Sequence, residues 1–124
     1  MSKKKPAIRW LNKPAKHDHA AAGRYLSLLF DEATVARHIK KLRRAEVSMF
    51  EAKDLLRASN LPPLGGSNPH VRQDRQKISK GTPLSPLLLV RDSQNARLII
   101  ADGYHRLCAV YSVDEDARIP CCLE

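Results

Sequence analysis

The sequence contains few cysteines: Cys108, Cys121 and Cys122 are the only three in 124 residues. Their number is odd, two of them are adjacent, and none has Cys-x-x-Cys spacing. A disulfide framework uses an even set of cysteines, and a structural zinc site uses closely spaced ligand pairs. The cysteine content therefore argues against both and favours a reducing compartment.

Long apolar runs and aromatic side chains are also scarce. No segment reaches the run of about 18 apolar residues that a membrane-spanning helix requires, and no apolar region follows the basic start MSKKKPAIRW. We therefore expect a cytoplasmic protein without a membrane partner. Phe, Trp and Tyr make up 5% of the chain, which argues against a stacking platform for single-stranded nucleic acid.

Acidic residues are outnumbered by basic ones. The chain has 22 Lys and Arg against 13 Asp and Glu, and its formal net charge is +9. Such an excess on a small protein attracts polyanions, so nucleic acid and nucleotides are candidate partners. Part of the excess lies in SKKK at 2–5 and KKLRR at 40–44. These two runs are as consistent with a solvated tail and a solvated helix surface as with binding to a polyanion.

Three helices are expected in the first half of the chain, after a flexible basic arm at 1–17 that Trp10 and Leu11 would hold. Apolar residues recur at helical spacing in each expected helix, and a capping residue precedes each of them. Ser48 and Glu51 have the spacing of a capping box. The expected caps and inward residues are Asp18 with Ala22, Leu26 and Leu29, Asp31 with Val35, Ile39 and Leu42, and Ser48 with Met49, Ala52 and Leu56.

The stretch NLPPLGGSNP at 60–69 separates this helical half from a mixed half. Asn68 is a suitable cap for a basic helix at 69–80, which Gly81 would end. The apolar runs PLLLVRD, RLIIA and RIPCCLE are expected strands, and 103–112 is an expected helix. If the strands before and after that helix were parallel, their crossover would be right-handed.

The stretch ADGYHRLCAV at 101–110 joins a strand to a helix through a glycine turn. Gly103 can adopt backbone angles that other residues avoid, and it lets an anion approach the main chain. The N–H groups of Tyr104, His105 and Arg106 would be unpaired donors at the positive end of the helix dipole. A helix start of this kind binds phosphate.

The same stretch also allows a purely structural interpretation. Asp102 would then only cap the helix, and Arg106 would pair with a surface carboxylate such as Asp114 or Asp116.

At these residues the chain resembles the ParB/sulfiredoxin superfamily. The segment PLSPLLLVRDSQNARLIIADGYHRLCAVYSVDEDARIPCCLE is similar to that fold's core: two strands, a Gly-x-His-Arg type of turn into a helix, and a closing strand. The resemblance covers 61–124. It implies an α/β (α+β) fold with a small mixed sheet and helices, preceded here by an N-terminal helical extension at 18–60.

The resemblance also implies a ligand. The matching turn holds ATP phosphates in sulfiredoxins and lies near CTP phosphates in ParB proteins. A form found in free-standing ParB-like proteins, including ADP-dependent serine kinases, is matched by Asp102, Gly103, His105 and Arg106. These residues, with the N–H of Tyr104, are thus implied to bind the phosphates of ATP, ADP or CTP. Asp102 and His105 are the implied catalytic residues, Asp102 as a base or a Mg²⁺ ligand or else only as the helix cap.

Other positions refine this expectation. Tyr104 replaces the catalytic cysteine of sulfiredoxins, so sulfinic acid reduction is not expected, and Cys108 is expected in the core. Lys80 and Thr82, next to the first strand of this segment, are candidates to complete the nucleotide site, although a solvated helix face would explain them equally well. His17 and His19 have no third ligand at a suitable spacing, so no metal site of the protein's own is expected.

The expected function is therefore nucleotide or phosphate binding, with phosphoryl transfer or hydrolysis as an open extension. The alternative is a DNA-binding or partition-associated ParB-like module without catalysis. For that alternative, KKLRRAEVSMFEAKDLLRA at 40–58 offers only a poor helix-turn-helix. A nuclease is not supported, because the carboxylates at 114–116 follow one another on what reads as a solvated helix end.

Overall fold

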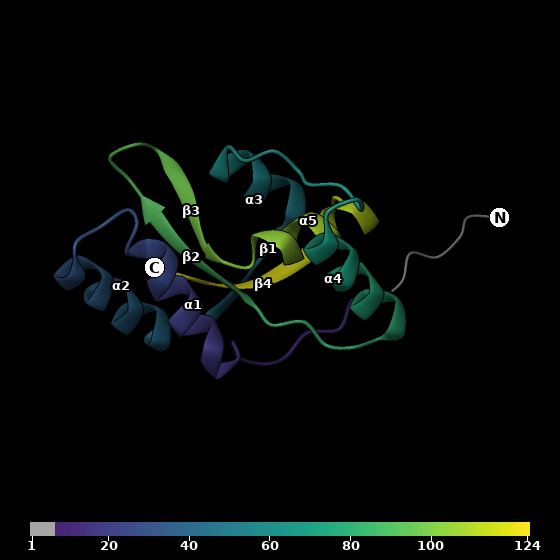
Figure 1. Cartoon of the computed structure of the whole chain (residues 1–124), viewed down its shortest axis with the longest axis horizontal. Helices are drawn as coiled ribbons and strands as arrows, with labels where there is room; N and C mark the ends of the chain where they lie inside the picture. Colours follow the sequence, from purple (N-terminus) through teal and green to yellow (C-terminus); the bar gives the residue numbers. More distant parts are fainter. Residues whose placement is uncertain (1–6) are drawn as a thin grey trace.

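Four strands form one mixed sheet in the computed structural model, which describes residues 7–124 (Figure 1). Helices make up 46% and strands 21%, so the expected mixed α/β class is confirmed. The elements are α1 (Lys16–Leu26), α2 (Glu32–Arg44), β1 (Val47–Glu51), α3 (Ala52–Ser59), α4 (Pro69–Lys80), β2 (Leu87–Asp92), β3 (Arg97–Asp102), α5 (Tyr104–Val113) and β4 (Arg118–Leu123).

The strand order in the sheet is β1-β4-β2-β3. β2 and β3 form an antiparallel hairpin, β1 is antiparallel to β4, and β2 and β4 are parallel neighbours. The strands joined by α5, β3 and β4, are therefore separated by β2 and run in opposite directions. The right-handed crossover was expected only for parallel strands, so it does not apply to β3 and β4.

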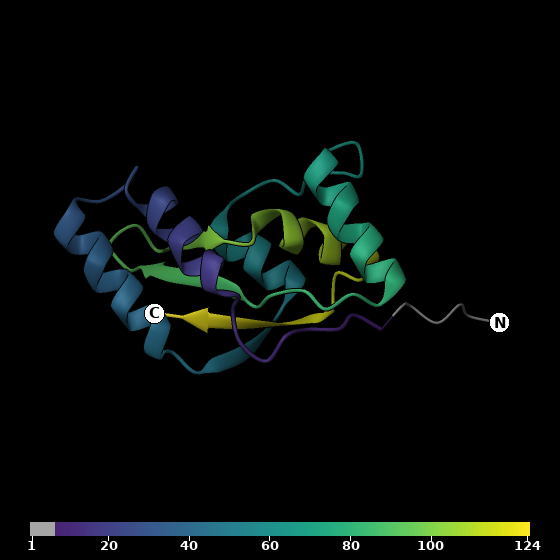
Figure 2. The same cartoon turned by 60° about the horizontal axis from the view of Figure 1, so that its bottom comes forward.

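Helices cover both faces of the sheet. Because side chains alternate along a strand, Leu87 and Leu89 of β2 face one way and Leu88 and Val90 face the other. The first pair packs in a core with α3, α4 and α5, and the second pair packs in a core with α1 and α2. α2 and α4 lie toward opposite ends of the long axis (Figures 1 and 2).

The segment before α1 is attached to the rest of the fold. Leu11 N donates to Leu84 O at 2.8 Å, Leu84 N donates to Arg9 O at 2.9 Å, and Trp10 packs against the core of α3, α4 and α5. The expectation that Trp10 and Leu11 hold this segment is thus confirmed. Residues 1–6 of the expected arm lie outside the described residues.

The expected third helix is wrong over its first turn. Val47–Glu51 is the strand β1, whose Phe50 pairs with Ile119 of β4, and α3 begins only at Ala52. Pairing with a strand far along the chain outweighed the local capping-box pattern. Since β1 separates α2 from α3, these helices do not form a helix-turn-helix.

The other helix starts agree better with the sequence. Asp31 caps α2 by accepting from Thr34 N at 2.8 Å, and Asn68 caps α4. Gly81 ends α4 in the left-handed region at φ 73°. Asp18 is not a cap, because α1 starts after Ala15; instead its Oδ2 accepts from Ala15 N at 3.1 Å.

Candidate functional site

A small polar cavity lies where β3 passes into α5, beside the first half of α4. Its volume is about 170 Å³. All five residues from Asp102 to Arg106 line it, so the structure brings these sequence-predicted residues together. The remaining lining residues are His70, Gln73 and Asp74 of α4.

Lys80 and Thr82 are not brought to this cavity. They are exposed at the C-terminal end of α4 and just beyond it, whereas the cavity is lined by the opposite half of that helix. A 12-residue helix is about 18 Å long, and this length separates its two ends.

Gly103 makes the turn at the cavity possible. Its φ is +108°, and a Cβ atom there would lie 2.8 Å from Leu87 Cγ and 2.9 Å from Arg106 Nη2. Gly103 is the N-cap of α5, and no side chain caps this helix. The N–H groups of Tyr104, His105 and Arg106 therefore lack a side-chain acceptor within the described part of the chain.

Arg106 folds back onto the end of β3. Its Nη2 donates to Asp102 Oδ2 at 2.9 Å and to Pro86 O at 3.4 Å, and Asp18 Oδ2 lies 4.0 Å away. The carboxylate partner of Arg106 is thus Asp102, one helical turn away, and neither Asp114 nor Asp116 of the structural interpretation. Asp102 is not the helix cap either.

Burial and this ion pair act in opposite directions on Asp102. Burial raises the pKa of Asp102, while the charge and hydrogen bond of Arg106 lower it, and the first effect is the larger. Asp18 is 2% exposed, and its Oδ2 lies 4.0 Å from the Arg106 guanidinium. Arg106 therefore lies between Asp102 at the cavity and Asp18 of α1.

Two imidazoles form another side of the cavity. The rings of His70 and His105 are 4.8 Å apart between centroids. Burial and the neighbouring His70 lower the pKa of His105, which Asp74 partly opposes, so its neutral form is favoured. Burial also raises the pKa of Asp74. A neutral imidazole offers one donor and one acceptor, as a proton acceptor requires.

Tyr104 and Cys108 have structural contacts. The Tyr104 hydroxyl donates to Pro62 O and fixes the loop after α3 against α5. Cys108 is fully buried, its Sγ accepts from Leu64 N at 3.3 Å, and burial raises the pKa of its thiol. Burial raises the pKa of Cys121 to about 12. These thiols are poor nucleophiles, and Cys108 is the core residue that was expected.

The sequence interpretation missed Asp18, His70, Gln73 and Asp74 as members of this region. The three α4 residues belong to a helix that was expected at the correct place, but its exposed polar positions all look alike in sequence. Only the packing of α4 against α5 selects those that face the β3–α5 turn.

His70, Asp74, Asp102 and His105 line the cavity but do not form a ready-made metal site. Within residues 7–124, no group of three or more His, Cys, Asp or Glu side chains is placed to hold a metal ion. His17 of the His-x-His pair is 85% exposed and lies 3.3 Å from Asp18, whereas both ring nitrogens of His19 are buried without a partner within the described chain.

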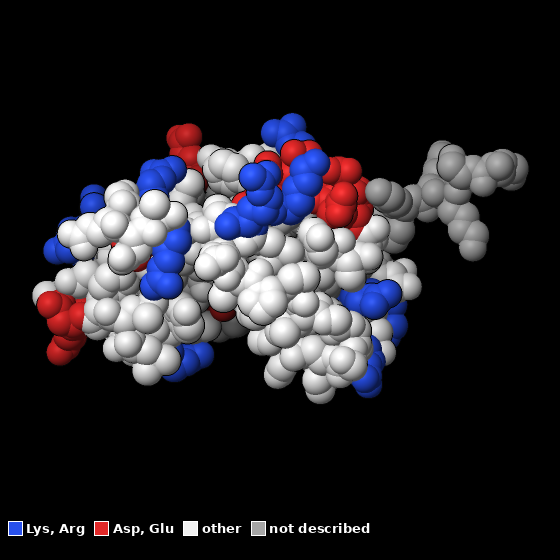
Figure 3. Space-filling view, turned by 90° about the horizontal axis from the view of Figure 1, so that it is seen from above, with Lys and Arg blue, Asp and Glu red and all other residues white. Residues whose placement is uncertain are grey.

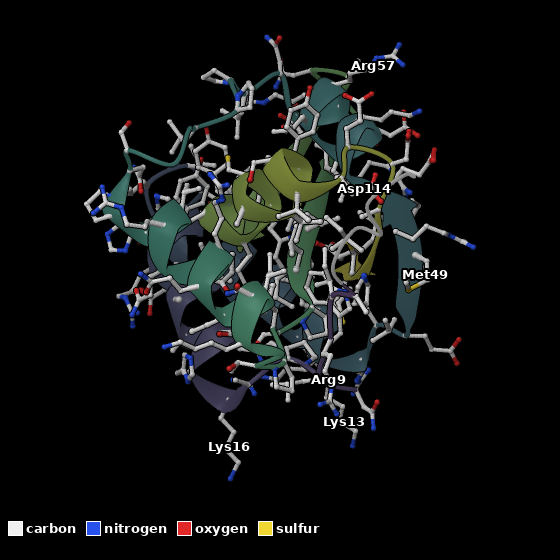
Figure 4. All side chains as sticks on the ribbon, turned by 90° about the vertical axis from the view of Figure 1, so that its right-hand side faces the viewer. Arg9, Lys13, Lys16, Met49, Arg57 and Asp114 are labelled. Carbon is white, nitrogen blue, oxygen red and sulfur yellow. The ribbon has the colours of Figure 1, made fainter. Side chains whose placement is uncertain are left out.

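Basic side chains are distributed over several surfaces. Figure 3 shows one face on which they form separate groups, with acidic side chains at several places among them. Arg9, Lys13 and Lys16 lie along another edge and point outward (Figure 4). The net charge is therefore not concentrated at the polar cavity.

No protein-family model matches the chain, and no curated protein or solved structure matches it either. The class defined by the structure is a mixed α/β protein with a polar cavity at a strand-to-helix turn. Among the helices described for 7–124, none has the length and apolarity that crossing a membrane requires.

Proposed function

We propose that the chain is a ParB-like nucleotide-binding protein that holds the phosphates of its ligand at the start of α5. The observation that carries this proposal is the uncapped helix start opening into a polar cavity, where Gly103 with its φ of +108° makes the turn. A helix N-terminus supplies both free N–H donors and a positive partial charge to phosphate oxygens.

Arg106 provides a second reason to place a phosphate here. Its Nε is buried and has no acceptor within the described residues. A buried donor without a partner costs free energy, and a phosphate oxygen would supply the acceptor that it lacks.

The carboxylates of Asp74 and Asp102 line the same cavity and would repel a bare anion. Mg²⁺ commonly binds one or two carboxylates together with phosphate oxygens, and Asp74 or Asp102 would be the residue that holds it here. We therefore assign ATP, ADP or CTP with Mg²⁺ as the ligand class. In phosphoryl transfer or hydrolysis, His105 would accept the proton, and Asp102 would position Arg106 or contact the metal.

The test is a thermal-shift screen of ATP, ADP, CTP, GTP and pyrophosphate, each with and without Mg²⁺, followed by calorimetric titration. A ligand that binds only the folded state raises the melting temperature. A flat response over the whole panel would remove the nucleotide assignment.

Gln73→Glu locates the binding site without disturbing the fold. Gln73 is exposed and lines the cavity, so the added charge should weaken nucleotide binding about tenfold. Gln76→Glu is the matched control, because Gln76 is exposed one turn later on α4 and lines a different cavity. Equal effects of the two substitutions would show that the phosphates bind elsewhere.

Nucleic-acid binding through α2 is a second candidate function. Arg37, Lys40, Arg43 and Arg44 are exposed, and within the described chain no carboxylate lies within 4.0 Å of them. A stripe of this kind suits the phosphates of a duplex, and binding should weaken as salt rises.

Fluorescence anisotropy with a short DNA duplex tests this candidate. Lys40→Glu should reduce the slope of log Kd against log salt concentration by the contribution of about one phosphate contact. Arg57→Glu on α3 makes the same charge change at a site that is 84% exposed and should leave most of the slope intact. Equal slopes for the two variants would contradict an α2 interface.

A further inference from the structure

An apolar cavity of about 520 Å³ opens beside the β2–β3 hairpin, away from the polar cavity. The sheet contributes Leu89, Leu98 and Leu123 to its lining, and α3 contributes Leu55 and Ala58. None of its lining residues belongs to the polar cavity. It is therefore a separate site, independent of the proposed nucleotide.

The cavity follows from the short length of α3. This helix has only eight residues, whereas the strands β2 and β3 continue beyond it to the hairpin turn. Arg91 pairs with Leu98 across the hairpin, and strand alternation puts it on the same face as Leu89. An arginine thus replaces the buried leucines of β2 at the point where helix cover ends.

Arg91 is the uncompensated charge at this cavity. The other charged lining residues have partners, since Arg97 Nε lies 3.4 Å from Asp92 Oδ2 and Asp54 Oδ1 lies 3.8 Å from Arg57 Nη1. Within residues 7–124, no carboxylate lies within 4.0 Å of the Arg91 guanidinium. A mostly apolar cavity therefore ends at one free cation.

We propose that this cavity binds a small amphiphile with an apolar chain or ring and one anionic headgroup, a medium-chain carboxylate being the simplest case. Its volume falls within the range of about 300 to 1,000 Å³ that is typical of small-molecule sites. The leucines take the apolar part of the ligand, and Arg91 binds the headgroup, since a guanidinium can donate two parallel hydrogen bonds to a carboxylate.

The probes are hexanoate, octanoate and decanoate, titrated by calorimetry into the full-length protein at constant ionic strength. Each methylene that becomes buried should lower Kd by about fourfold at most, so decanoate should bind most tightly. Decyltrimethylammonium, with the opposite charge, should bind more weakly than decanoate. Equal affinity along the chain-length series, or tighter binding of the cation, would overturn the proposal.

Two substitutions at exposed positions test the two halves of the site. Ala58→Trp should weaken decanoate binding by filling the cavity, and Arg91→Gln should weaken it about three- to tenfold. Arg37→Gln, on α2 at the other face of the sheet, removes the same charge and should change Kd by less than about twofold.

Melting curves for each variant establish that it is folded. If Arg91→Gln and Arg37→Gln weakened decanoate binding equally, the effect would come from net charge alone, and the assignment of Arg91 would be overturned. A folded Ala58→Trp protein with unchanged affinity would place the ligand outside this cavity and also overturn the proposal.

Discussion

Gly103 is a position where both the backbone conformation and the packing disfavour a side chain. Gly103→Ala should lower the free energy of unfolding by about 2 to 4 kcal/mol, because a side chain is strained at this φ and its Cβ would meet Leu87 and Arg106. Chemical denaturation of the purified variant measures the loss.

Gly65→Ala is the matched control for this prediction. A Cβ at Gly65 would meet no atom within 4 Å, and its φ lies outside the positive region. The substitution should therefore change stability by less than about 0.5 kcal/mol. A Gly103→Ala protein as stable as the Gly65→Ala protein would contradict the strain argument.

His19 should make stability depend on pH. Burial, followed by the charge of Arg43, lowers its pKa from 6.5, while Asp18 and Asp102 oppose this shift. The folded state therefore favours neutral imidazole, and the stabilisation is complete above pH 6.5 and declines as pH falls toward the lowered value. His105 contributes in the same direction.

Urea unfolding between about pH 7.5 and 5.5 tests this expectation. Stability should fall with pH in the native chain, and the fall should be smaller in His19→Gln, which cannot titrate. The pKa values of Asp74 and Asp102 are raised from 3.8, so these two groups lower the stability as pH rises above 3.8. Their effect therefore opposes that of the histidines. A native chain whose stability rises on acidification over this range would contradict the assignment.

At the same scale, the sequence predicted the part of the polar cavity that is contiguous in the chain. Residues 102–106 meet because one turn contains them, and a glycine between a strand and a helix is visible as a local pattern. Asp18 and Asp74 reach the region only through packing of α1 and α4. The periodicity of the sequence does not distinguish these two residues from other exposed or capping carboxylates.

At the scale of elements, local signals predicted most of the helices and the strands β2, β3 and β4, but not β1. Asp31, Asn68 and Gly81 mark helix ends through bonds or angles within a few residues. β1 has no such signal, because its register is fixed by β4, whose Cys121 pairs with Ser48 from far along the chain. A distant partner strand cannot be read from the spacing of Ser48 and Glu51.

The cap of α4 gives a prediction for an element. Asn68 Oδ1 accepts from His70 N at 2.9 Å and from Val71 N at 3.2 Å. Asn68→Ala removes this acceptor and should lower the free energy of unfolding by about 1 kcal/mol. Asn68→Asp keeps an acceptor and should stay near the native value in thermal or chemical unfolding. Equal losses in both variants would show that the side chain acts through something other than the cap.

For the whole molecule, the expected division at 60/61 does not match how the cores form. α1 and α2, expected as an extension, bury the face of the sheet that carries Leu88, Val90 and Ile99. β1, from the same part of the chain, adds an edge strand next to β4. The resemblance concerned only 61–124, and nothing in that segment's local pattern shows which elements cover its second face.

The fragment 61–124 should therefore fail to fold by itself. It lacks the helices that cover Leu88, Val90 and Ile99, which are at most 5% exposed in the full chain. Exposing each of these side chains costs about 1.5 to 3 kcal/mol, and the stability of a whole domain is only about 5 to 15 kcal/mol. The fragment should give a poorly dispersed amide NMR spectrum, whereas the full chain should unfold in one cooperative transition. A fragment with dispersed signals and a cooperative melt would show that 61–124 is an autonomous core and that α1, α2 and β1 are additions to it.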